Sequence, residues 1–492
     1  MDQKEESLNC KIFNFLRKDG CCLICCLRYL KGHGKELLDV KSSLEKRGIV
    51  VPEDGQNVVH PCPCCLNLFS EHCLYGTLCR IRKKDDFCKF FCEKFVLSFC
   101  LPVGLDIRQL IIWMKLIGEF GDVISKDERM DTTPKDALRS ILIPQICECL
   151  KAEYDREGVM ITLTYRCKID EDESAALAKI KPECFQQKKE NKKIKTELNR
   201  TAVEKYLVPS RLRQDEWEGI LKIPQACEDS FVAVEITYTG PTVFVAGRYQ
   251  KFSRELSQTP WILQGERMVM NSVQEIIEGS LVGYFTDRPM KESKICFSAS
   301  GREDVDVRCL GRGRPFVLEI TNSYISDISP VAGRAIEENI AKSGHVAVTH
   351  LQVVDRAEVV RIKEGEESKK KMYRALCLLE SPATVEIMKK LNISEEFTVQ
   401  QFTPIRVLHR RALMTRPRII YSVKARLSKD HNCLLVIDIQ TQAGTYVKEL
   451  VHGEFGRTQP SLATIIGQKI DILSLDVTDI DLDWPKPVNY MH

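Results

Sequence analysis

The chain has 492 residues, of which 43% are hydrophobic and 29% are charged, and its formal net charge is +3. That length is too great for one ordinary hydrophobic core, so two or three domains are expected in a soluble globular protein. The nearly balanced charge excludes a polycation, so any surface that binds nucleic acid must be local.

The sequence contains no apolar run of the length that spans a bilayer. Its first residues, MDQKEESLNCKIFNF, are charged and lack the apolar core of a signal peptide. We therefore expect an intracellular protein, in the nucleus, the cytoplasm or both, with no membrane partner.

Cysteine is unusually abundant near the N-terminus, because 13 of the 22 cysteines lie in the first 100 residues. Without a secretory signal, thiolate–metal chemistry is a better interpretation than a disulfide framework. Cys22-x-x-Cys25 and Cys62-x-x-Cys65 have the spacing of zinc knuckles, and two such turns would bring four thiolates to one tetrahedral ion. The register is open, because neighbouring cysteines could replace them: Cys21, Cys26 and Cys64. Reduced, unpaired cysteines are the alternative.

The remainder of the N-terminal region, residues 1–180, predicts a mixed α/β domain. Residues 87–100 and 106–118 carry apolar side chains three to four positions apart, which is typical of helices with one buried face. Residues 134–152 predict another helix and 159–169 predict a strand. Residues 181–204 are polar and rich in lysine, which predicts a charged linker or an exposed helix.

The most informative stretch is SGREDVDVRCLGRGRPFVL, residues 300–318. Apolar and polar residues alternate over 304–308, which predicts a strand, a turn at Gly311 and Gly313, and a second strand. Asp304 is surrounded in sequence by four cations: Arg302, Arg308, Arg312 and Arg314. An acid so surrounded is expected to stay ionised, as a nucleophile or a base must be. A surface ion pair in a hairpin is the alternative.

Two basic stretches predict contact with RNA, because cations meet phosphates and aromatic faces stack on unpaired bases. The first, GRYQKFSRELSQTPW at 247–261, offers Arg248, Tyr249, Lys251 and Arg254. The second, at 402–418, contains no acid and offers Arg406, His409, Arg410, Arg411 and Arg416. An ordinary solvated basic loop is the alternative for both. Elsewhere in this region the pattern predicts a helix over 330–343 and strands over 350–362 and 369–379.

Several of these stretches together resemble one family. Gly-Arg-x-Asp at Asp304 is similar to the catalytic motif of pseudouridine synthases. The longer string GREDVDVRCLGRGRPF resembles the archaeal and eukaryotic tRNA pseudouridine synthases whose N-terminal domain contains zinc-binding cysteines and a THUMP module. Four further strings are similar to motifs of that family: CxxCxLRY with CxxCL, GRYxKFSRxLxQTPW, Lys-x-Tyr at 371–373, and GTYVKEL at 444–450.

The resemblance implies roles for particular residues. Asp304 would act on the ribose of a flipped uridine, either by attacking C1′ or by removing the C2′ proton. Lys448 would pair with this acid, and Arg302 could share that role. Tyr373 would stack on the target uracil and Leu450 would floor the pocket, although both could equally be core residues. The resemblance also favours Cys22, Cys25, Cys62 and Cys65 as ligands of a structural Zn²⁺, with no cofactor for catalysis.

The resemblance implies an architecture and a substrate as well. An N-terminal zinc-binding, THUMP-containing domain would precede a pseudouridine synthase domain over 205–492, built on a mixed, mainly antiparallel sheet with flanking helices. That domain would carry a finger loop at about 258–271 and a thumb loop at about 402–417. The expected substrate is a T-loop uridine of tRNA, at position 54 and also 55, bound through the T-arm and acceptor region by a monomer. Other structured RNA is a further expected partner.

Two other classes of function compete with this one. A non-catalytic RNA-binding adaptor, or an RNA-processing cofactor, needs the zinc site and the basic loops but not Asp304. A metal-dependent nuclease is disfavoured, because no clustered set of Asp and Glu ligands for two metals is found in the sequence.

Overall fold

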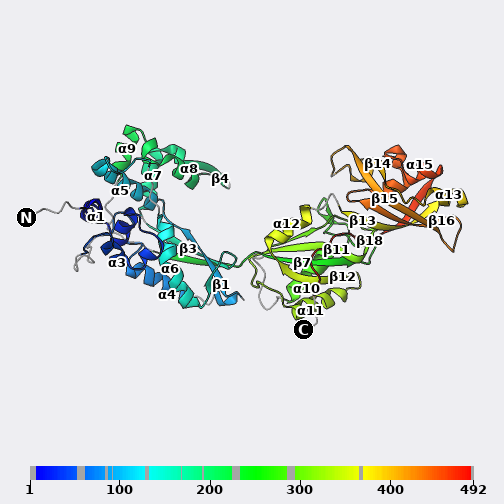
Figure 1. Ribbon diagram of the computed structural model, residues 1–492, viewed down its shortest axis with the longest axis horizontal. Coiled ribbons are helices and arrows are strands. Elements are labelled where there is room, and N and C mark those ends of the chain that lie inside the picture. Colours follow the sequence, from blue (N-terminus) through cyan, green and yellow to red (C-terminus); the bar gives the residue numbers. More distant parts are fainter. Residues whose placement is uncertain are drawn as a thin grey trace, which may run out of the picture. The chain divides into compact units, whose positions relative to one another are not determined.

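Figure 1 shows the computed structural model, which describes residues 7–51, 61–83, 87–90, 92–127, 132–167, 169–190, 193–223, 233–284, 294–364, 369–409 and 411–488. The chain forms two compact units, Met1–Gly240 and Pro241–His492. Each unit combines helices with a sheet, so the mixed α/β class predicted from the sequence is confirmed. Within these described ranges, no helix is both long and apolar enough to cross a membrane.

The first unit contains a four-stranded sheet with the order β2-β1-β3-β6. β1 (Lys94–Cys100) pairs in parallel with β2 (Glu153–Tyr154) and β3 (Val159–Arg166), and β3 pairs antiparallel with β6 (Ala233–Thr239). The helices of this unit are α1 (Leu8–Lys18), α2 (Leu23–Tyr29), α3 (Val40–Glu45), α4 (Glu71–Lys83), α5 (Gly104–Phe120), α6 (Pro134–Leu150), α7 (Asp170–Ile180), α8 (Arg200–Tyr206) and α9 (Gln214–Leu221).

The helix predicted over 87–100 is wrong. Only Phe87–Lys89 is helical, as a single 3-10 turn, and β1 follows it. In β1 the side chains of Phe95, Leu97 and Phe99 are buried, and the residues between them are not. Apolar residues that recur every second position also recur every fourth position, which is close to the helical repeat. The alternating pattern of this strand could therefore be mistaken for that of a helix.

Most of the segment 181–204 is a hairpin, in which β4 (Phe185–Glu190) pairs antiparallel with β5 (Lys193–Leu198), and α8 begins at Arg200. The predicted start of the second domain at 205 also differs from the structure. Ile220 of α9 packs in one buried cluster with Ile111 of α5 and Leu177 of α7, so α9 belongs to the first unit. The boundary between the units therefore lies at Gly240–Pro241.

The second unit contains a large sheet with the order β12-β7-β11-β18-β13-β16-β15-β14-β17, and β10 also pairs with β11. All of its described strand pairs are antiparallel except β11 with β18. The strands are β7 (Val243–Lys251), β10 (Lys294–Ala299), β11 (Arg308–Thr321), β12 (Val346–Val354), β13 (Lys370–Leu379), β14 (Phe397–Phe402), β15 (Thr415–Leu427), β16 (Leu434–Gln442), β17 (Thr458–Gln459) and β18 (Ile470–Ile480). A small separate hairpin, β8 (Ile262–Leu263) with β9 (Glu266–Arg267), lies within the predicted finger loop.

Helices pack on this sheet and define its core. They are α10 (Val273–Tyr284), α11 (Pro330–Ala341), α12 (Arg356–Glu364), α13 (Val385–Lys390), α14 (Val447–His452) and α15 (Leu462–Ile466). Ile277 of α10 and Ile336 of α11 share a buried cluster with Val245 and Leu318 of the sheet, and Figure 1 shows both helices beside β7 and β12. Because α14 begins shortly after β16 ends, its first turn lies near the end of a central strand.

Two strand predictions in this unit need correction. The strand expected over 350–362 ends at Val354, and Asp355 then starts α12 by accepting a hydrogen bond from Glu358 N at 2.7 Å. The turn expected at Gly311 and Gly313 is a bulge inside the continuous strand β11. Gly311 has a φ of +62°, and a Cβ atom there would lie 1.9 Å from a backbone oxygen of β18. The two glycines thus permit a close approach of strands, not a reversal of the chain.

Candidate active site and metal centre

Asp304 lies in the loop that joins β10 to β11, residues 300–307. At the base of this loop, Ser300 N donates a hydrogen bond to Pro315 O at 2.9 Å. Gly301 has a φ of +85°, a backbone conformation that residues with a side chain rarely adopt, so glycine suits the first position of Gly-Arg-x-Asp. The side chain of Asp304 is 30% exposed, which leaves its carboxylate accessible.

Two cations from distant segments hold this carboxylate. Arg406 Nη1 donates to Asp304 Oδ2 at 2.7 Å, and Lys448 Nζ lies 3.5 Å from the same oxygen. Arg406 also donates from Nε to Glu449 Oε1 at 2.7 Å, and Glu449 is buried. Lys448 makes its closer bonds to Asp306, at 2.8 and 2.9 Å. Asp304 is therefore oriented by a network of charged groups from the β10–β11 loop, the β14–β15 connection and α14.

The charge states in this network follow from the same contacts. Burial disfavours the charge of Arg406, but its bond to Glu449 and the charge of Asp304 raise the pKa of the guanidinium above its usual value. Burial also disfavours ionisation of Asp306, but the bond and the charge of Lys448 lower the pKa of that carboxyl. The network therefore keeps cations facing Asp304 at neutral pH.

The four arginines nearest Asp304 in sequence do not surround it in space. Three of them pair with other acids: Arg308 with Asp476 (2.7 Å), Arg312 with Asp479 (2.9 Å) and Arg314 with Glu303 (2.7 Å). Arg302 is exposed and makes no ion pair with the residues that the structure describes. Arg308, Arg312 and Arg314 lie on β11, and two of their three partners belong to the neighbouring strand β18, so closeness in sequence did not bring these arginines to Asp304.

The stretch 247–254 supports the loop that contains Asp304, whereas the sequence predicted contact with RNA. Lys251 Nζ donates to the carbonyl oxygens of Asp304 (3.0 Å) and Val305 (2.8 Å). Arg254 donates to Asp306 O at 2.9 Å and also pairs with Asp476. These lysine and arginine side chains therefore hold the backbone around Asp304.

Arg248 and Tyr249, the other two residues of this stretch that were predicted to contact RNA, are also enclosed by the fold. Arg248 donates to the carbonyl oxygens of Arg312 and Gly313, and Tyr249 OH donates to Glu303 Oε1 at 2.8 Å. Arg248 is 5% exposed, and Tyr249 and Lys251 are fully buried. These three side chains lie in the strand β7 and not in a solvated loop, so their burial does not support the predicted contact with RNA.

Tyr373 and Leu450 both belong to the hydrophobic core of the second unit. Tyr373 is half-buried on β13, beside Ile439 of β16 and Val477 of β18. Burial raises the pKa of Tyr373 to about 12, and the charges of Glu303 and Asp304 add to this effect. The ring is therefore an uncharged phenol at neutral pH. Leu450 is fully buried within the core cluster, as a core leucine would be.

The basic segment 402–418 is divided between two environments. Its 3-10 turn, Ile405–Val407, directs Arg406 to Asp304 and Glu449. His409 and Arg411 are exposed and Arg416 is partly exposed, and none of the three forms an ion pair with the described residues. Arg410 lies outside the described residues.

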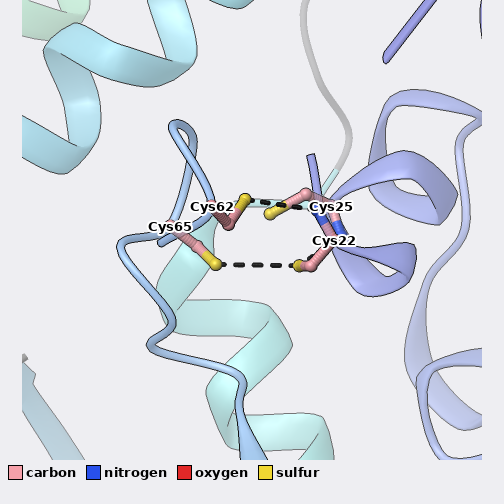
Figure 2. A group of neighbouring side chains, drawn as sticks. All are labelled: Cys22, Cys25, Cys62 and Cys65. Atoms are coloured by element: carbon pink, nitrogen blue, oxygen red, sulfur yellow. Dashed lines mark hydrogen bonds between the residues drawn. The ribbon is translucent and has the colours of Figure 1, made fainter. Parts of the chain in front are cut away.

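A second candidate site lies in the first unit, where four cysteines meet (Figure 2). The sulfur atoms of Cys22, Cys25, Cys62 and Cys65 all lie within 4.8 Å of one another, and Cys22 Sγ is 3.7 Å from Cys65 Sγ. A tetrahedral ion with Zn–S bonds of about 2.3 Å requires sulfur atoms roughly 3.8 Å apart. The four thiols, which the sequence also favoured, could thus hold a metal ion.

Local hydrogen bonds explain why these four cysteines, and not their neighbours in sequence, form the group. Cys22 caps α2, and its sulfur accepts a hydrogen bond from Cys25 N at 3.5 Å. Cys22 N in turn donates to Cys62 Sγ at 3.3 Å. Such N–H donors favour thiolates, which are the form that binds metals. The neighbouring cysteines are buried outside the group of four: Cys21, Cys26 and Cys64.

Comparison with known proteins gives the relationship of the whole chain. Residues 244–481 match the family described as "Pus10, C-terminal", and residues 62–235 match "Eukaryotic Pus10, N-terminal". A Drosophila melanogaster protein that bears the Pus10 name is 45% identical over 497 residues, which cover 98% of both chains. The chain belongs to the Pus10 family. Pseudouridine synthases are isomerases, so this member of the Pus10 family is an isomerase.

Two other Pus10 relatives share less sequence identity with this chain. The tRNA pseudouridine synthase Pus10 of Xenopus laevis is 35% identical over 90% of this chain and 84% of its own. The Homo sapiens protein of that name is 34% identical over 86% and 79%. Among solved structures, a Cbf5-Nop10-Gar1 complex aligns over 48% of each chain at 16% identity, with a TM-score of 0.26 that supports no further argument.

Three acids of this Pus10-family site were not predicted from sequence. They are Glu303, Asp306 and Glu449, which bind Arg314, Lys448 and Arg406. Each stands directly beside, or two positions from, a residue that the sequence did single out. That adjacency was the available signal, but acids are common on surfaces and the sequence cannot show that Glu303 and Glu449 are buried.

The buried pair of Glu303 and Arg314 yields a prediction about stability. Their side chains are 0% and 2% exposed, and Glu303 raises the pKa of Arg314 even though burial opposes the charge. Glu303→Gln leaves a buried guanidinium without its counter-ion, and we expect the free energy of unfolding of the second unit to fall by roughly 3–5 kcal/mol. Calorimetric unfolding of the full chain measures this loss.

The matched control is Glu380→Gln. Glu380 pairs with Lys469 at 3.1 Å, but these side chains are 54% and 87% exposed. Solvent screening should limit that loss to less than about 1 kcal/mol. Equal losses for the two variants would contradict the assignment of Glu303 as the essential partner of Arg314.

Proposed function

We propose that this chain converts uridine to pseudouridine in the T-loop of tRNA, at position 54 and also at 55. The observation that carries the proposal is the accessible carboxylate of Asp304 between Arg406 and Lys448, in a chain whose relatives are named tRNA pseudouridine synthases. The choice of the T-loop as the target rests on the resemblance of the sequence motifs of this chain to those of the tRNA pseudouridine synthase family.

The reaction rearranges one nucleotide. The N1–C1′ glycosidic bond breaks, the uracil turns, and a C5–C1′ bond forms while the proton on C5 moves to N1. No atom is gained from outside and no electron is transferred. The target base must first leave its stack, because a protein group cannot reach C1′ or C2′ inside a folded loop.

Asp304 would carry the chemical step in one of two ways. Its carboxylate either attacks C1′ to give a covalent intermediate or removes the proton from C2′. Both routes require an ionised acid with a free lone pair. Arg406 occupies Oδ2 in the free chain, and the partial exposure of Asp304 leaves room for a ribose to approach.

The remaining side chains would position the uracil and the carboxylate of Asp304 relative to each other. Arg406 and Lys448 orient Asp304 and balance its charge. The half-buried ring of Tyr373 offers an uncharged face on which the freed uracil can stack. An enclosed pocket would also keep water from the intermediate.

We further propose that the four cysteines of the first unit hold Zn²⁺. Four thiolates are the donor set of structural zinc sites, and they leave no position for water or a substrate. The ion would supply folding stability to the knuckles around α2 and takes no part in the isomerisation.

Mapping of the product on an unmodified tRNA transcript tests the function. We expect pseudouridine in the T-loop at position 54, with less at 55, and a transcript with cytidine at 54 should lose the first product while still binding. The competing adaptor has the same basic surfaces but needs no chemistry. Tight binding of tRNA without any pseudouridine would favour the adaptor and contradict the enzyme.

A further inference from the structure

Phe455 is an aromatic side chain that the fold does not use. Its side chain is 98% exposed, in a 3-10 turn (Glu454–Gly456) between α14 and β17. Its φ of +56° and ψ of +33° are left-handed, a conformation that large side chains rarely adopt. The three neighbours Gly453, Glu454 and Gly456 also have positive φ values, of +78°, +42° and +86°. Glycine would suit this backbone better, and neither core packing nor backbone preference explains a phenylalanine.

Hydrogen bonds connect this turn to the segment 402–406, which contacts Asp304. Ile405 N donates to Glu454 Oε1 at 3.0 Å, and Phe402 N donates to Arg457 O at 2.8 Å. The guanidinium of Arg457 also lies 4.4 Å from the centre of the Phe402 ring. Arg406, which directly follows Ile405 in this segment, donates a hydrogen bond to Asp304. Phe455 therefore projects from one rim of the active site.

The chemistry of that rim is basic with isolated apolar groups. The segment 402–418 contains no acid, and His409 and Arg411 are exposed without an ion pair to the described residues. Ile405 and Leu408 are 52% and 41% exposed. The one acid of the turn, Glu454, is 10% exposed and already binds Arg457 and Ile405 N. Exposed basic side chains bind phosphates and an exposed aromatic ring can stack on an unpaired base, so this segment and this turn together suit single-stranded RNA.

We infer that Phe455 stacks on an unpaired nucleobase of the RNA substrate, outside the uracil pocket, while exposed cations of 402–418 bind the adjoining phosphates. The occupant is RNA and not an apolar protein surface, because the segment to which this turn is hydrogen-bonded, 402–418, is basic and contains no acid. The inference rests on the proposed function, since it takes the tRNA as the occupant. Stacking would fix the strand next to the target uridine and would contribute to binding more than to the chemical step.

Equilibrium binding of the unmodified tRNA transcript to the full chain tests this inference. Loss of one base–aromatic stack should weaken binding roughly 5- to 100-fold in Phe455→Ala. Phe455→Tyr keeps the ring and should bind within about twofold of the unchanged chain, whereas Phe455→Leu keeps only apolar surface and should resemble Ala. Leu473→Ala removes another exposed apolar side chain, on β18, and should have no effect.

A second measurement separates stacking from a folding defect. Phe455→Trp places an indole at the site, and its fluorescence should be quenched by tRNA beyond the change seen in the unchanged chain. The variants should share one unfolding temperature, because Phe455 is not packed.

Normal tRNA binding by Phe455→Ala, or by Phe455→Leu, would overturn the stacking role while leaving the proposed function intact. Failure of the unchanged chain itself to bind tRNA would instead count against the proposed function. Lower turnover with unchanged binding in Phe455→Ala would also overturn the inference, because a stacking contact outside the reacting base should alter KM more than kcat.

Discussion

Asp304→Asn is expected to lower the rate of pseudouridine formation by at least about a thousandfold. Asparagine has nearly the same shape and can still accept the hydrogen bond from Arg406, so the loop should keep its conformation. An amide, however, neither attacks C1′ at a useful rate nor removes a proton from C2′. Single-turnover conversion of an unmodified tRNA transcript measures the loss, and binding of that transcript should remain within a few fold.

Asp306→Asn is the matched control for this change. Asp306 lies in the same loop and binds Lys448 more closely than Asp304 does, but its side chain is 63% exposed. Its loss frees Lys448 to move toward Asp304, so we expect activity within about tenfold of the unchanged chain. If the two variants lost activity equally, the loop would matter as a whole and the assignment of Asp304 as the reacting acid would fail.

The comparison of sequence and structure shows which kind of residue a motif can identify. The spacing of Cys22-x-x-Cys25 and Cys62-x-x-Cys65 places ligands through local backbone geometry, and those four sulfurs do meet. The motif residue Lys448 likewise lies within 3.5 Å of Asp304, although its closer partner is Asp306. Each Cys-x-x-Cys pair could be read from its local spacing, whereas the contact between Lys448 and Asp304 was expected only because their motifs resemble those of the family.

Residues that act through tertiary packing could not be assigned in this way. Lys251 and Arg248 were predicted to bind phosphate because the sequence shows their charge. It does not show that β7 lies between β11 and β12 in the sheet. Arg406 was assigned to RNA, yet in the structure it donates a hydrogen bond to the carboxylate of Asp304. In both cases the decisive partner is 50 or more residues away, and its position depends on the order of strands in the sheet.

Loss of one metal ligand should have the largest effect on folding. Cys62 is buried, accepts a hydrogen bond from Cys22 N, and supplies one of the four sulfurs. A structural zinc site contributes about 10–16 kcal/mol of binding free energy to folding, and three thiolates retain only part of it. We expect Cys62→Ser to bind less than one zinc per chain and to unfold the region around α2 at physiological temperature. Zinc content and limited proteolysis of the full chain measure these effects.

Cys88→Ser is the control for this change, because Cys88 is exposed and lies outside the four-cysteine group. It should retain one zinc per chain and the unfolding temperature of the unchanged protein. A strong chelator should reproduce the effect of Cys62→Ser in the unchanged chain, while the calorimetric transition of the second unit stays in place, because none of the four ligands belongs to that unit. Full stability of the chelated, zinc-free chain would show that the four cysteines are ordinary core residues, since a structural site cannot lose its ion without loss of folding free energy.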